Sequence, residues 1–284
     1  LKITAVSTSG AWASGGNMGT GRDFLAGAGT QTAGLAFGGG FPQTNATEHY
    51  DGSAWTGGGN MGTARNSLGG AGTDTAGLGF GGYDSPITNV TEHYDGSAWT
   101  AGGNMGTGRR WMGSAGTQTA GLAFGGLVSY TTFNATEHYD GSAWTSGGNM
   151  ATARYSLGSA GTQTAGLAFG GGSPLTNATE HYDGSAWTAG GNMGTARYSL
   201  AGAGTQTAGL AFGGSDYPAS NATEHYDGSA WTAGGNMGTA RYSLAGAGTL
   251  SAGLGFGGYD GNSNTNATEE YAGPGIISKT VTSS

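Results

Sequence analysis

The sequence predicts an all-β fold, a closed β-propeller of six four-stranded blades, on three observations. Each repeated unit contains four short segments of strand character separated by turn signals. No stretch of 11 or more residues shows apolar side chains at helical spacing. A unit of about 44 residues with four strands has the period of a propeller blade. The repeat is marked by Trp12, Trp55, Trp99, Trp144, Trp187 and Trp231, at intervals of 43 to 45 residues.

The unit at 177–214 shows the expected strands most clearly. Strand alternation would point Leu210 and Phe212 to one side of the blade, and Gly209 and Ala211 to the other. Because blades cover one another on both faces, we expect large side chains of one blade to meet small ones of the next. The four predicted strands are 177–182, 185–190, 198–203 and 208–213.

The two ends of the sequence predict how the propeller closes. Residues 10–18 have the character of a fourth strand carrying Trp12, whereas the last unit supplies three strands through Tyr271 and lacks a Trp. We expect these parts to form one blade, which removes the open sheet edge.

The predicted domain is therefore the whole chain, 1–284, with 1–18 and 259–284 completing the same blade. Two flanking segments, 2–7 and 276–282, are also β-prone. We expect them either to pair with each other or to lead to another part of the protein.

Composition excludes several classes of function. The chain of 284 residues has 64 Gly, 36% hydrophobic and 9% charged residues, with a formal net charge of −8. Nine basic residues cannot provide a dense phosphate-binding surface, so we expect no nucleic-acid partner. Without Cys there is no disulfide or thiolate site, and we expect no metal or other cofactor. No apolar run of about 18 residues predicts membrane insertion.

A short signature recurs along nearly the whole chain. One unit contains, in order, Gly170-Gly171, Tyr182, Trp187, Met193 and Arg197. This order resembles the kelch repeat, which implies a propeller but not one activity, because kelch propellers include both enzymes and binding modules. The near-identical, glycine-rich units also resemble kelch-like arrays encoded by marine viruses and uncultured bacteria. That second resemblance implies a virion fibre protein.

Five His residues occupy one repeated position. Metal binding or general base catalysis is one interpretation, and a structural residue on the third strand is the other. Blade symmetry would spread them around a ring, so we expect no shared metal, and the sixth copy is Glu270. The five are His49, His93, His138, His181 and His225.

Repeated carboxylates allow two interpretations as well. A pair could hydrolyse sugars, or each Glu could pair with the repeated Arg while each Asp forms a hairpin turn. We expect the second, because no catalytic constellation breaks the symmetry. The Glu set is Glu48, Glu92, Glu137, Glu180, Glu224 and Glu269, the Asp set Asp51, Asp95, Asp140, Asp183 and Asp227, and the Arg set Arg65, Arg109, Arg154, Arg197 and Arg241.

The repeated Asn-Ala-Thr, with one Asn-Val-Thr at Asn89, fits an N-glycosylation sequon and equally fits a turn that opens a strand. We favour the turn. The other copies begin at Asn45, Asn134, Asn177, Asn221 and Asn266.

The segments that differ between units are the candidate ligand-binding regions. One set follows the double glycines and should emerge on one rim, and a second follows the repeated Arg. Functional residues concentrate on loops of rigid scaffolds, although drift in unconstrained loops is the alternative. The candidates are Phe41, Tyr83, Arg110, Trp111, Tyr130, Phe133, Tyr217 and Tyr259.

The third unit should dominate, since it has the longest loop, 127–133, and the unique pair Arg110-Trp111. We expect its Leu127, Val128, Tyr130 and Phe133 side chains to be exposed. Trp111 should be replaceable by Tyr, which we take to be its counterpart in other units.

The sequence as a whole favours a non-enzymatic binding or structural module on a virion, as a tail fibre or surface protein, or in an extracellular adhesion protein. Its partner would be a cell-surface glycan or protein, with other virion or fibre proteins as possible neighbours. The alternative is a kelch-type carbohydrate-active enzyme, a hydrolase or an oxidase. Resemblance to copper radical oxidases of that fold would require a Cys-linked Tyr, and the chain has no Cys. An intracellular kelch adaptor is a third, less favoured interpretation.

Overall fold

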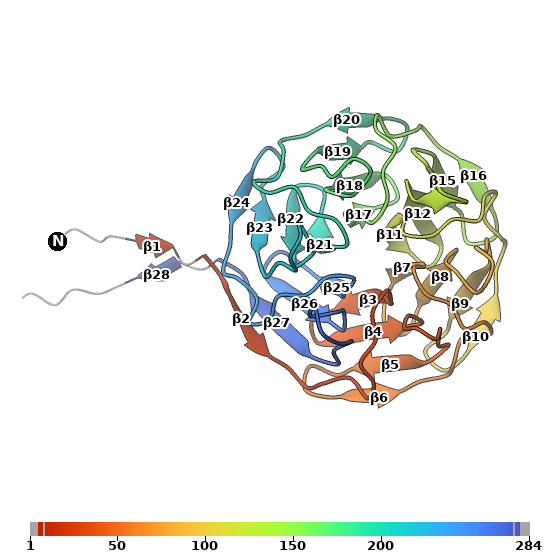
Figure 1. Ribbon diagram of the computed structural model, residues 1–284, viewed down its shortest axis with the longest axis horizontal. Helices are drawn as coiled ribbons and strands as arrows, with labels where there is room; N and C mark the ends of the chain where they lie inside the picture. Colours follow the sequence, from red (N-terminus) through yellow and green to blue (C-terminus); the bar gives the residue numbers. More distant parts are fainter. Residues whose placement is uncertain (1–4, 8, 275, 279–284) are drawn as a thin grey trace, which may run out of the picture.

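The computed structural model describes residues 5–7, 9–274 and 276–278. Six four-stranded antiparallel sheets are arranged radially around a central axis, and the described residues contain no helix (Figure 1). The predicted all-β, six-bladed propeller is confirmed.

The blades are numbered here in chain order of their inner strands. Blade 1 contains β3 (Ala26–Thr30), β4 (Ala33–Phe37), β5 (Thr47–Tyr50) and β6 (Trp55–Gly57). Blade 2 contains β7 (Gly69–Gly72), β8 (Gly77–Phe80), β9 (Thr91–Tyr94) and β10 (Trp99–Ala101). Blade 3 contains β11 (Gly113–Thr117), β12 (Ala120–Phe124), β15 (Thr136–Tyr139) and β16 (Trp144–Ser146). Blade 4 contains β17 (Gly158–Thr162), β18 (Ala165–Phe169), β19 (Thr179–Tyr182) and β20 (Trp187–Ala189). Blade 5 contains β21 (Ala201–Thr205), β22 (Ala208–Phe212), β23 (Thr223–Tyr226) and β24 (Trp231–Ala233). Blade 6 contains β25 (Ala245–Gly248), β26 (Ala252–Phe256), β27 (Thr268–Ala272) and β2 (Ala11–Ser14).

The inner strand of each blade begins later than the sequence predicted. In blade 5 the strand was expected from Tyr198, but β21 starts at Ala201. Ser199 has a φ of 52°, a left-handed conformation that interrupts the extended chain. Tyr198 instead forms an isolated bridge with Ser215, which anchors the variable loop of the same blade.

Blade 6 closes the ring with strands from both ends of the chain, as predicted. β2 pairs antiparallel with β27 and places Trp12 opposite Tyr271. The flanking segments also pair with each other, through β1 (Ala5–Ser7) and β28 (Ile276–Ser278), which leave the propeller as a ribbon (Figure 1). The remainder of the two β-prone segments, 2–4 and 279–282, lies outside the described residues.

Large side chains of one blade fill space left by glycines of the next, as expected. A Cβ on Gly166 in blade 4 would lie 2.7 Å from Leu122 Cδ2 in blade 3, so a side chain there would displace the buried Leu122. The Trp of the outer strand also packs against the preceding blade. The centroid of the Trp187 ring lies 4.7 Å from that of the Phe124 ring in blade 3. Trp187 Nε1 also donates to Thr136 Oγ1 of blade 3 at 2.9 Å. Corresponding Trp–Thr hydrogen bonds join all six neighbouring pairs of blades.

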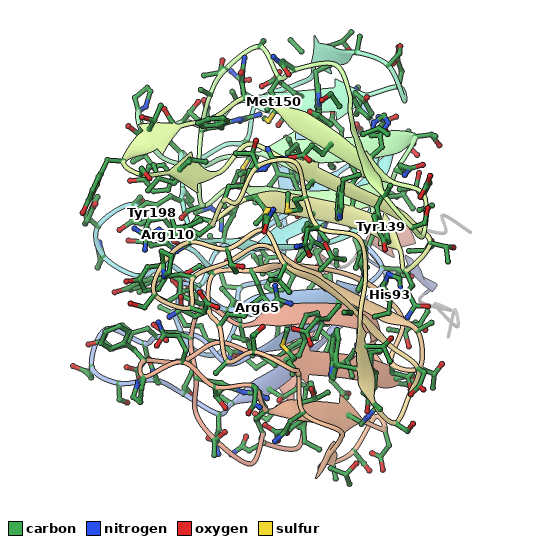
Figure 2. All side chains as sticks on the ribbon, turned by 90° about the vertical axis from the view of Figure 1, so that its right-hand side faces the viewer. Arg65, His93, Arg110, Tyr139, Met150 and Tyr198 are labelled. Atoms are coloured by element: carbon green, nitrogen blue, oxygen red, sulfur yellow. The ribbon has the colours of Figure 1, made fainter. Side chains whose placement is uncertain are left out.

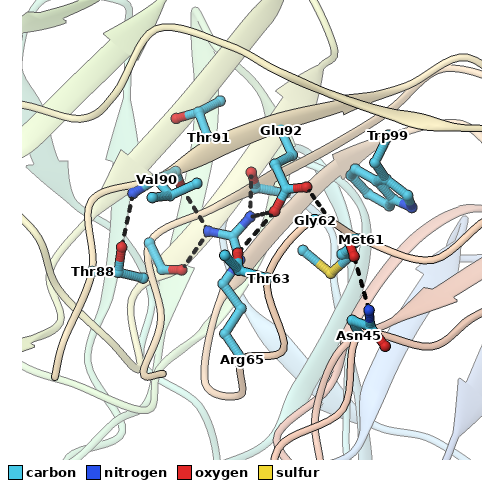
Figure 3. A network of polar contacts seen from close by, with 12 residues as sticks. Asn45, Met61, Gly62, Thr63, Arg65, Thr88, Val90, Thr91, Glu92 and Trp99 are labelled. Atoms are coloured by element: carbon cyan, nitrogen blue, oxygen red, sulfur yellow. Dashed lines mark hydrogen bonds and ion pairs between the residues drawn. The ribbon is translucent and has the colours of Figure 1, made fainter. Parts of the chain in front are cut away.

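A buried ion pair lies in every blade, which confirms the predicted Arg–Glu pairing. In blade 2, Arg65 Nη2 lies 2.9 Å from Glu92 Oε1, and its Nη1 donates to the carbonyls of Gly81 and Val90 (Figure 3). Glu92 Oε2 accepts a hydrogen bond from Gly62 N–H at 2.6 Å. Arg22–Glu48 adds a sixth pair to the five predicted; the others are Arg109–Glu137, Arg154–Glu180, Arg197–Glu224 and Arg241–Glu269.

The repeated Asp residues form turns, whereas the repeated Asn residues make long-range hydrogen bonds. Asp51 Oδ1 accepts hydrogen bonds from Ser53 N–H and Ala54 N–H, the expected role of an Asp in the outer hairpin. Asn45 Nδ2 donates to the carbonyl of Met61 at 3.0 Å (Figure 3), and the other five Asn residues bond in the same way. Since the amide nitrogen of each sequon is already engaged, these contacts give the Asn residues a structural role, but they do not place them in the predicted turn.

Candidate functional site

The two sets of variable segments lie on the same face of the propeller, which we call the variable face. It comprises the segments that follow the double glycines and the segments that follow the repeated Arg. In blade 3 they are bridged, because Leu127 N–H donates to Arg110 O at 2.8 Å and Arg110 N–H donates to Leu127 O at 3.1 Å. Figure 2 shows Arg110 and Tyr198 on this side and His93 and Tyr139 on the opposite side. The structure thus places the second set, whose position the sequence left open, beside the loops that were expected on one rim.

A groove on the variable face lies between the loops of blades 2 and 3. Its volume is about 740 Å³. The blade 2 side is Tyr83 with residues 85–87, the blade 3 side is 128–130, and residues 106–108 and Arg110 complete it. The structure therefore brings together three predicted site residues from two blades: Tyr83, Arg110 and Tyr130.

The guanidinium of Arg110 lies over two aromatic rings at this groove. Its guanidinium carbon lies 4.1 Å from the centroid of the Trp111 ring and 5.1 Å from that of Tyr83. Cation–π contacts of this kind use none of the hydrogen-bond donors of a guanidinium. Arg110 Nε is buried and has no hydrogen-bond partner among the described residues.

The tip of the blade 3 loop is a strained two-residue turn. It joins β13 (Leu127–Val128) to β14 (Thr131–Thr132), and both Ser129 and Tyr130 have positive φ values, 43° and 73°. Turns with φ above zero at both central residues favour Asn and Gly, so Ser and Tyr are costly there. The Tyr130 side chain is 94% exposed at this tip. An exposed turn that keeps a strained backbone conformation is a candidate for a functional role.

The expectation that Leu127, Val128, Tyr130 and Phe133 are all exposed is wrong. Leu127 is only 7% exposed, and Val128 and Phe133 are half-buried. The bridge to Arg110 places Leu127 beneath the loop, where its side chain is covered. Tyr130 is the member of this group that faces solvent.

The sequence interpretation matched Trp111 with the wrong residues of the other blades, shifted by one position along the chain. Its counterparts are not tyrosines but serines, except for Phe24 in blade 1. The six residues, which we call the collar, are Phe24, Ser67, Trp111, Ser156, Ser199 and Ser243. The N–H of each donates to the carbonyl of the preceding blade's member at 2.7 to 2.9 Å, so the bonds form a closed ring around the axis.

The expectation that Trp111→Tyr copies other blades is therefore wrong, because the residue at this position in blades 2, 4, 5 and 6 is Ser. Tyr155, Tyr198 and Tyr242 are instead the counterparts of Arg110. Between ring centroids, Trp111 lies 5.6 Å from Tyr155 and 6.0 Å from Phe24. Trp111 and Phe24 both line a small axial cavity of about 100 Å³. Phe24 was not among the candidates, although its position two residues after Arg22 would have revealed it.

The remaining candidates do not line the groove. Phe41 and Tyr217 are 81% and 80% exposed at the loops of blades 1 and 5. Tyr217 lies 5.4 Å from Tyr198, and Tyr259 of blade 6 lies 5.5 Å from Tyr242, between ring centroids. Phe133 stays at the base of the blade 3 loop, where its N–H donates to Gly126 O.

The repeated His residues join neighbouring blades on the opposite side of the molecule. His93 Nε2 lies 2.7 Å from Tyr139 Oη of the next blade, and the other four make the same contact. At the sixth seam Glu270 Oε1 accepts a hydrogen bond from Tyr50 at 2.6 Å. Burial, with Glu270 adding to it, raises the pKa of Tyr50 to about 12. Within the described ranges, no three His, Asp or Glu side chains converge on a point that could hold a metal.

Stability should fall as the pH falls below about 6.5. Burial lowers the pKa of four His side chains from the ordinary 6.5, so the unfolded chain binds protons that the folded chain does not. Their contribution is present above the unfolded pKa and is lost as the pH falls through the lower folded values. Thermal midpoints measured from pH 8 to pH 5 should decrease, and His93→Gln should reduce the slope. A midpoint that rises toward pH 5 would contradict this assignment. The four are His93, His138, His181 and His225.

Comparison with known proteins leaves the fold as the established property of the chain. Among the residues that the structure places, no helix has the length and apolar character to cross a membrane. Neither the family models nor the curated proteins contain a match to this sequence. The chain is a β-propeller of six four-stranded blades, with a groove on its variable face between blades 2 and 3.

Proposed function

We propose that this chain is a non-enzymatic binding module that takes its ligand in the groove between blades 2 and 3. The observation that carries the proposal is the convergence of Tyr83, Arg110 and Tyr130, all from variable segments, on that one groove. Variable loops on a repetitive, rigid scaffold are a common way to position binding residues.

The groove favours a glycan over a protein as the ligand. Its volume lies within the range of small-ligand sites, about 300 to 1,000 Å³. Tyr83 and Tyr130 offer aromatic rings for stacking on sugar faces, and Ser85 and Ser129 offer hydroxyl groups for sugar hydroxyls. A protein ligand would need a larger, flatter contact surface than these two loops provide.

A binding role also accounts for the use of the repeated polar side chains. Each buried Glu is paired with an Arg, and each of the five His residues contacts a Tyr of the next blade. These groups hold the scaffold together, so they are not needed for acid–base chemistry. This division of roles supports a binding module over the alternative of a carbohydrate-active enzyme.

The setting that we propose is a virion, as part of a tail fibre or surface protein, or an extracellular adhesion protein. The kelch-like order of a double glycine, Tyr, Trp, Met and Arg recurs along nearly the whole chain and supports a kelch-type propeller. One copy is Gly170-Gly171, Tyr182, Trp187, Met193 and Arg197. The near identity of the glycine-rich units supports the similarity to kelch-like arrays of marine viruses and uncultured bacteria. The ligand would then be a glycan on a target cell.

Exchanging the blade 3 loop tests the groove. Replacing 127–133 with Gly-Ser-Pro-Leu-Thr, the 172–176 segment of blade 4, should weaken glycan binding at least tenfold, about 1.4 kcal/mol. The fold should survive, because the first residue of each loop makes the same backbone hydrogen bond. Leu127 N–H donates to Arg110 O in blade 3, and Gly172 N–H donates to Tyr155 O in blade 4. Binding is measured on an array of neutral and acidic oligosaccharides, with thermal midpoints recorded in parallel.

The matched control places the same five residues over 215–220 in blade 5, away from the groove. It should leave array binding intact. A second variant, Tyr130→Gly, removes only the exposed ring and suits the φ of 73°, so it should bind more weakly while unfolding at the same or a higher temperature. If both blade 3 variants bind as the unaltered protein does, the groove is not the binding site.

A further inference from the structure

Arg110 differs from every other basic side chain that the structure describes. The six other Arg residues each form an ion pair with a Glu of their own blade, at 2.7 to 3.0 Å. Arg110, which lines the groove, has no carboxylate within ion-pair distance among the described residues. Asp84 is the only acidic residue of the two groove loops, 83–87 and 127–133, and it forms no ion pair with Arg110. The chain therefore supplies a guanidinium here without supplying its partner.

The surroundings of Arg110 prepare it for an anion of a particular shape. The guanidinium carbon lies 4.1 Å from the ring centroid of Trp111 and 5.1 Å from that of Tyr83, and these contacts leave its N–H donors free. A guanidinium offers two parallel N–H donors along its edge, and a carboxylate matches them with two oxygens. Arg110 also lines the groove together with Tyr130 and the hydroxyl groups of Ser85 and Ser129.

We propose that the groove recognises an acidic sugar, and that Arg110 binds its carboxylate. This inference rests on the proposed function, since it names the class of glycan that the same groove would take. Tyr83 and Tyr130 would contact the apolar face of the ring, while Ser85 and Ser129 would bond its hydroxyl groups.

The charge distribution favours a single carboxylate over a polyanion. A nucleic acid or a heavily sulfated chain gains affinity from many cations, and the formal net charge of this chain is −8. With six of the seven Arg residues neutralised in buried pairs, the groove presents one cation for one anionic group. A uronic or sialic type of sugar carries one carboxylate on each residue and meets this requirement.

The test compares matched acidic and neutral sugars on the unaltered protein and on two variants. The probes are sialyllactose against lactose and digalacturonic acid against a digalactoside, measured by calorimetry at low and physiological salt. Arg110→Tyr introduces the residue found at this position in blades 4, 5 and 6, so it should fold normally. Arg110→Lys keeps the charge but loses the planar pair of donors.

At least one acidic probe should bind ten- to a hundredfold more tightly than its neutral counterpart. Arg110→Tyr should abolish that preference, and Arg110→Lys should lose most of it. Equal binding of acidic and neutral sugars, with binding still removed by the blade 3 loop exchange, would overturn this inference and leave the proposed function standing. Tighter binding of an acidic peptide than of any acidic sugar would also overturn it. Failure of every sugar to bind would overturn the proposed glycan ligand itself.

Discussion

Deleting residues 1–18 should prevent the chain from folding cooperatively. The deletion removes β2 and with it Trp12, whose ring packs 4.9 Å from those of Phe212 and Tyr271, between centroids. It also removes Met18, which is 2% exposed in the core between blades 6 and 1. Loss of a fully buried Trp costs about 3–5 kcal/mol and loss of a buried Met about 2–5 kcal/mol. Trp12 is partly buried, so its loss should lie toward the lower end of the first range. Together these approach the whole stability of an ordinary domain, about 5–15 kcal/mol.

The deletion also leaves an open sheet edge on β27. Backbone groups that now bond β2 would face solvent, and an unpaired edge promotes aggregation. Circular dichroism melting and light scattering would measure both effects. A shorter deletion, 1–7, removes β1 but keeps β2, and it should melt close to the intact protein. If the 1–18 deletion melts at the temperature of the intact protein, closure by the Trp12 strand does not stabilise the ring.

Replacing Glu92 with Gln should lower the free energy of unfolding by about 3–5 kcal/mol. The Arg65 side chain is completely buried, and burial already lowers its pKa while the charge of Glu92 opposes that change. Glu92→Gln leaves the guanidinium charge buried without its ion-pair partner, which is the costly half of a broken buried pair; Asp84, which also acts on Arg65 but forms no ion pair with it, offsets only part of this loss. The hydrogen bond from Gly62 N–H is weakened at the same time. Urea unfolding at neutral pH would measure the loss.

Asp95→Asn is the matched control for this change. It removes the same unit of charge from the same blade, but Asp95 is fully exposed at the outer hairpin, and an amide oxygen can still accept its turn hydrogen bonds. Stability should change little. Glu137→Gln in blade 3 should repeat the large loss, since its pair with Arg109 is equally buried and no second carboxylate among the described residues acts on Arg109. Equal effects of Glu92→Gln and Asp95→Asn would show that the pair contributes no more than a surface charge.

The scaffold was predictable because repetition constrains each position many times over. A Glu and an Arg that recur in every unit of a charge-poor chain have few other partners, so their pairing followed from the sequence. The alternation of Leu210 and Phe212 with Gly209 and Ala211 likewise predicted the packing of large against small side chains between blades. Trp12 without a preceding double glycine, and a last unit without a Trp, predicted how the ring closes.

The candidate site was less predictable, because its parts come from different blades. Tyr83 and Tyr130 are far apart in sequence, and only the radial arrangement brings the loops of blades 2 and 3 together at Arg110. The burial of Leu127 depends on its bridge to Arg110, a contact that hydrophobicity alone does not indicate. The place of Trp111 in the collar depends on hydrogen bonds that run from blade to blade.

The sequence by itself determined the six blades, the strand alternation and the ion pairs, since those features repeat in every unit and rest on contacts of fixed spacing. It also determined the closing strand, because each end of the repeat array carries only part of a unit. The tertiary structure alone decided which variable side chains share the groove and which are covered. Those outcomes depend on the unique segments, where no second copy of the unit repeats the contact and the neighbouring blade sets the environment.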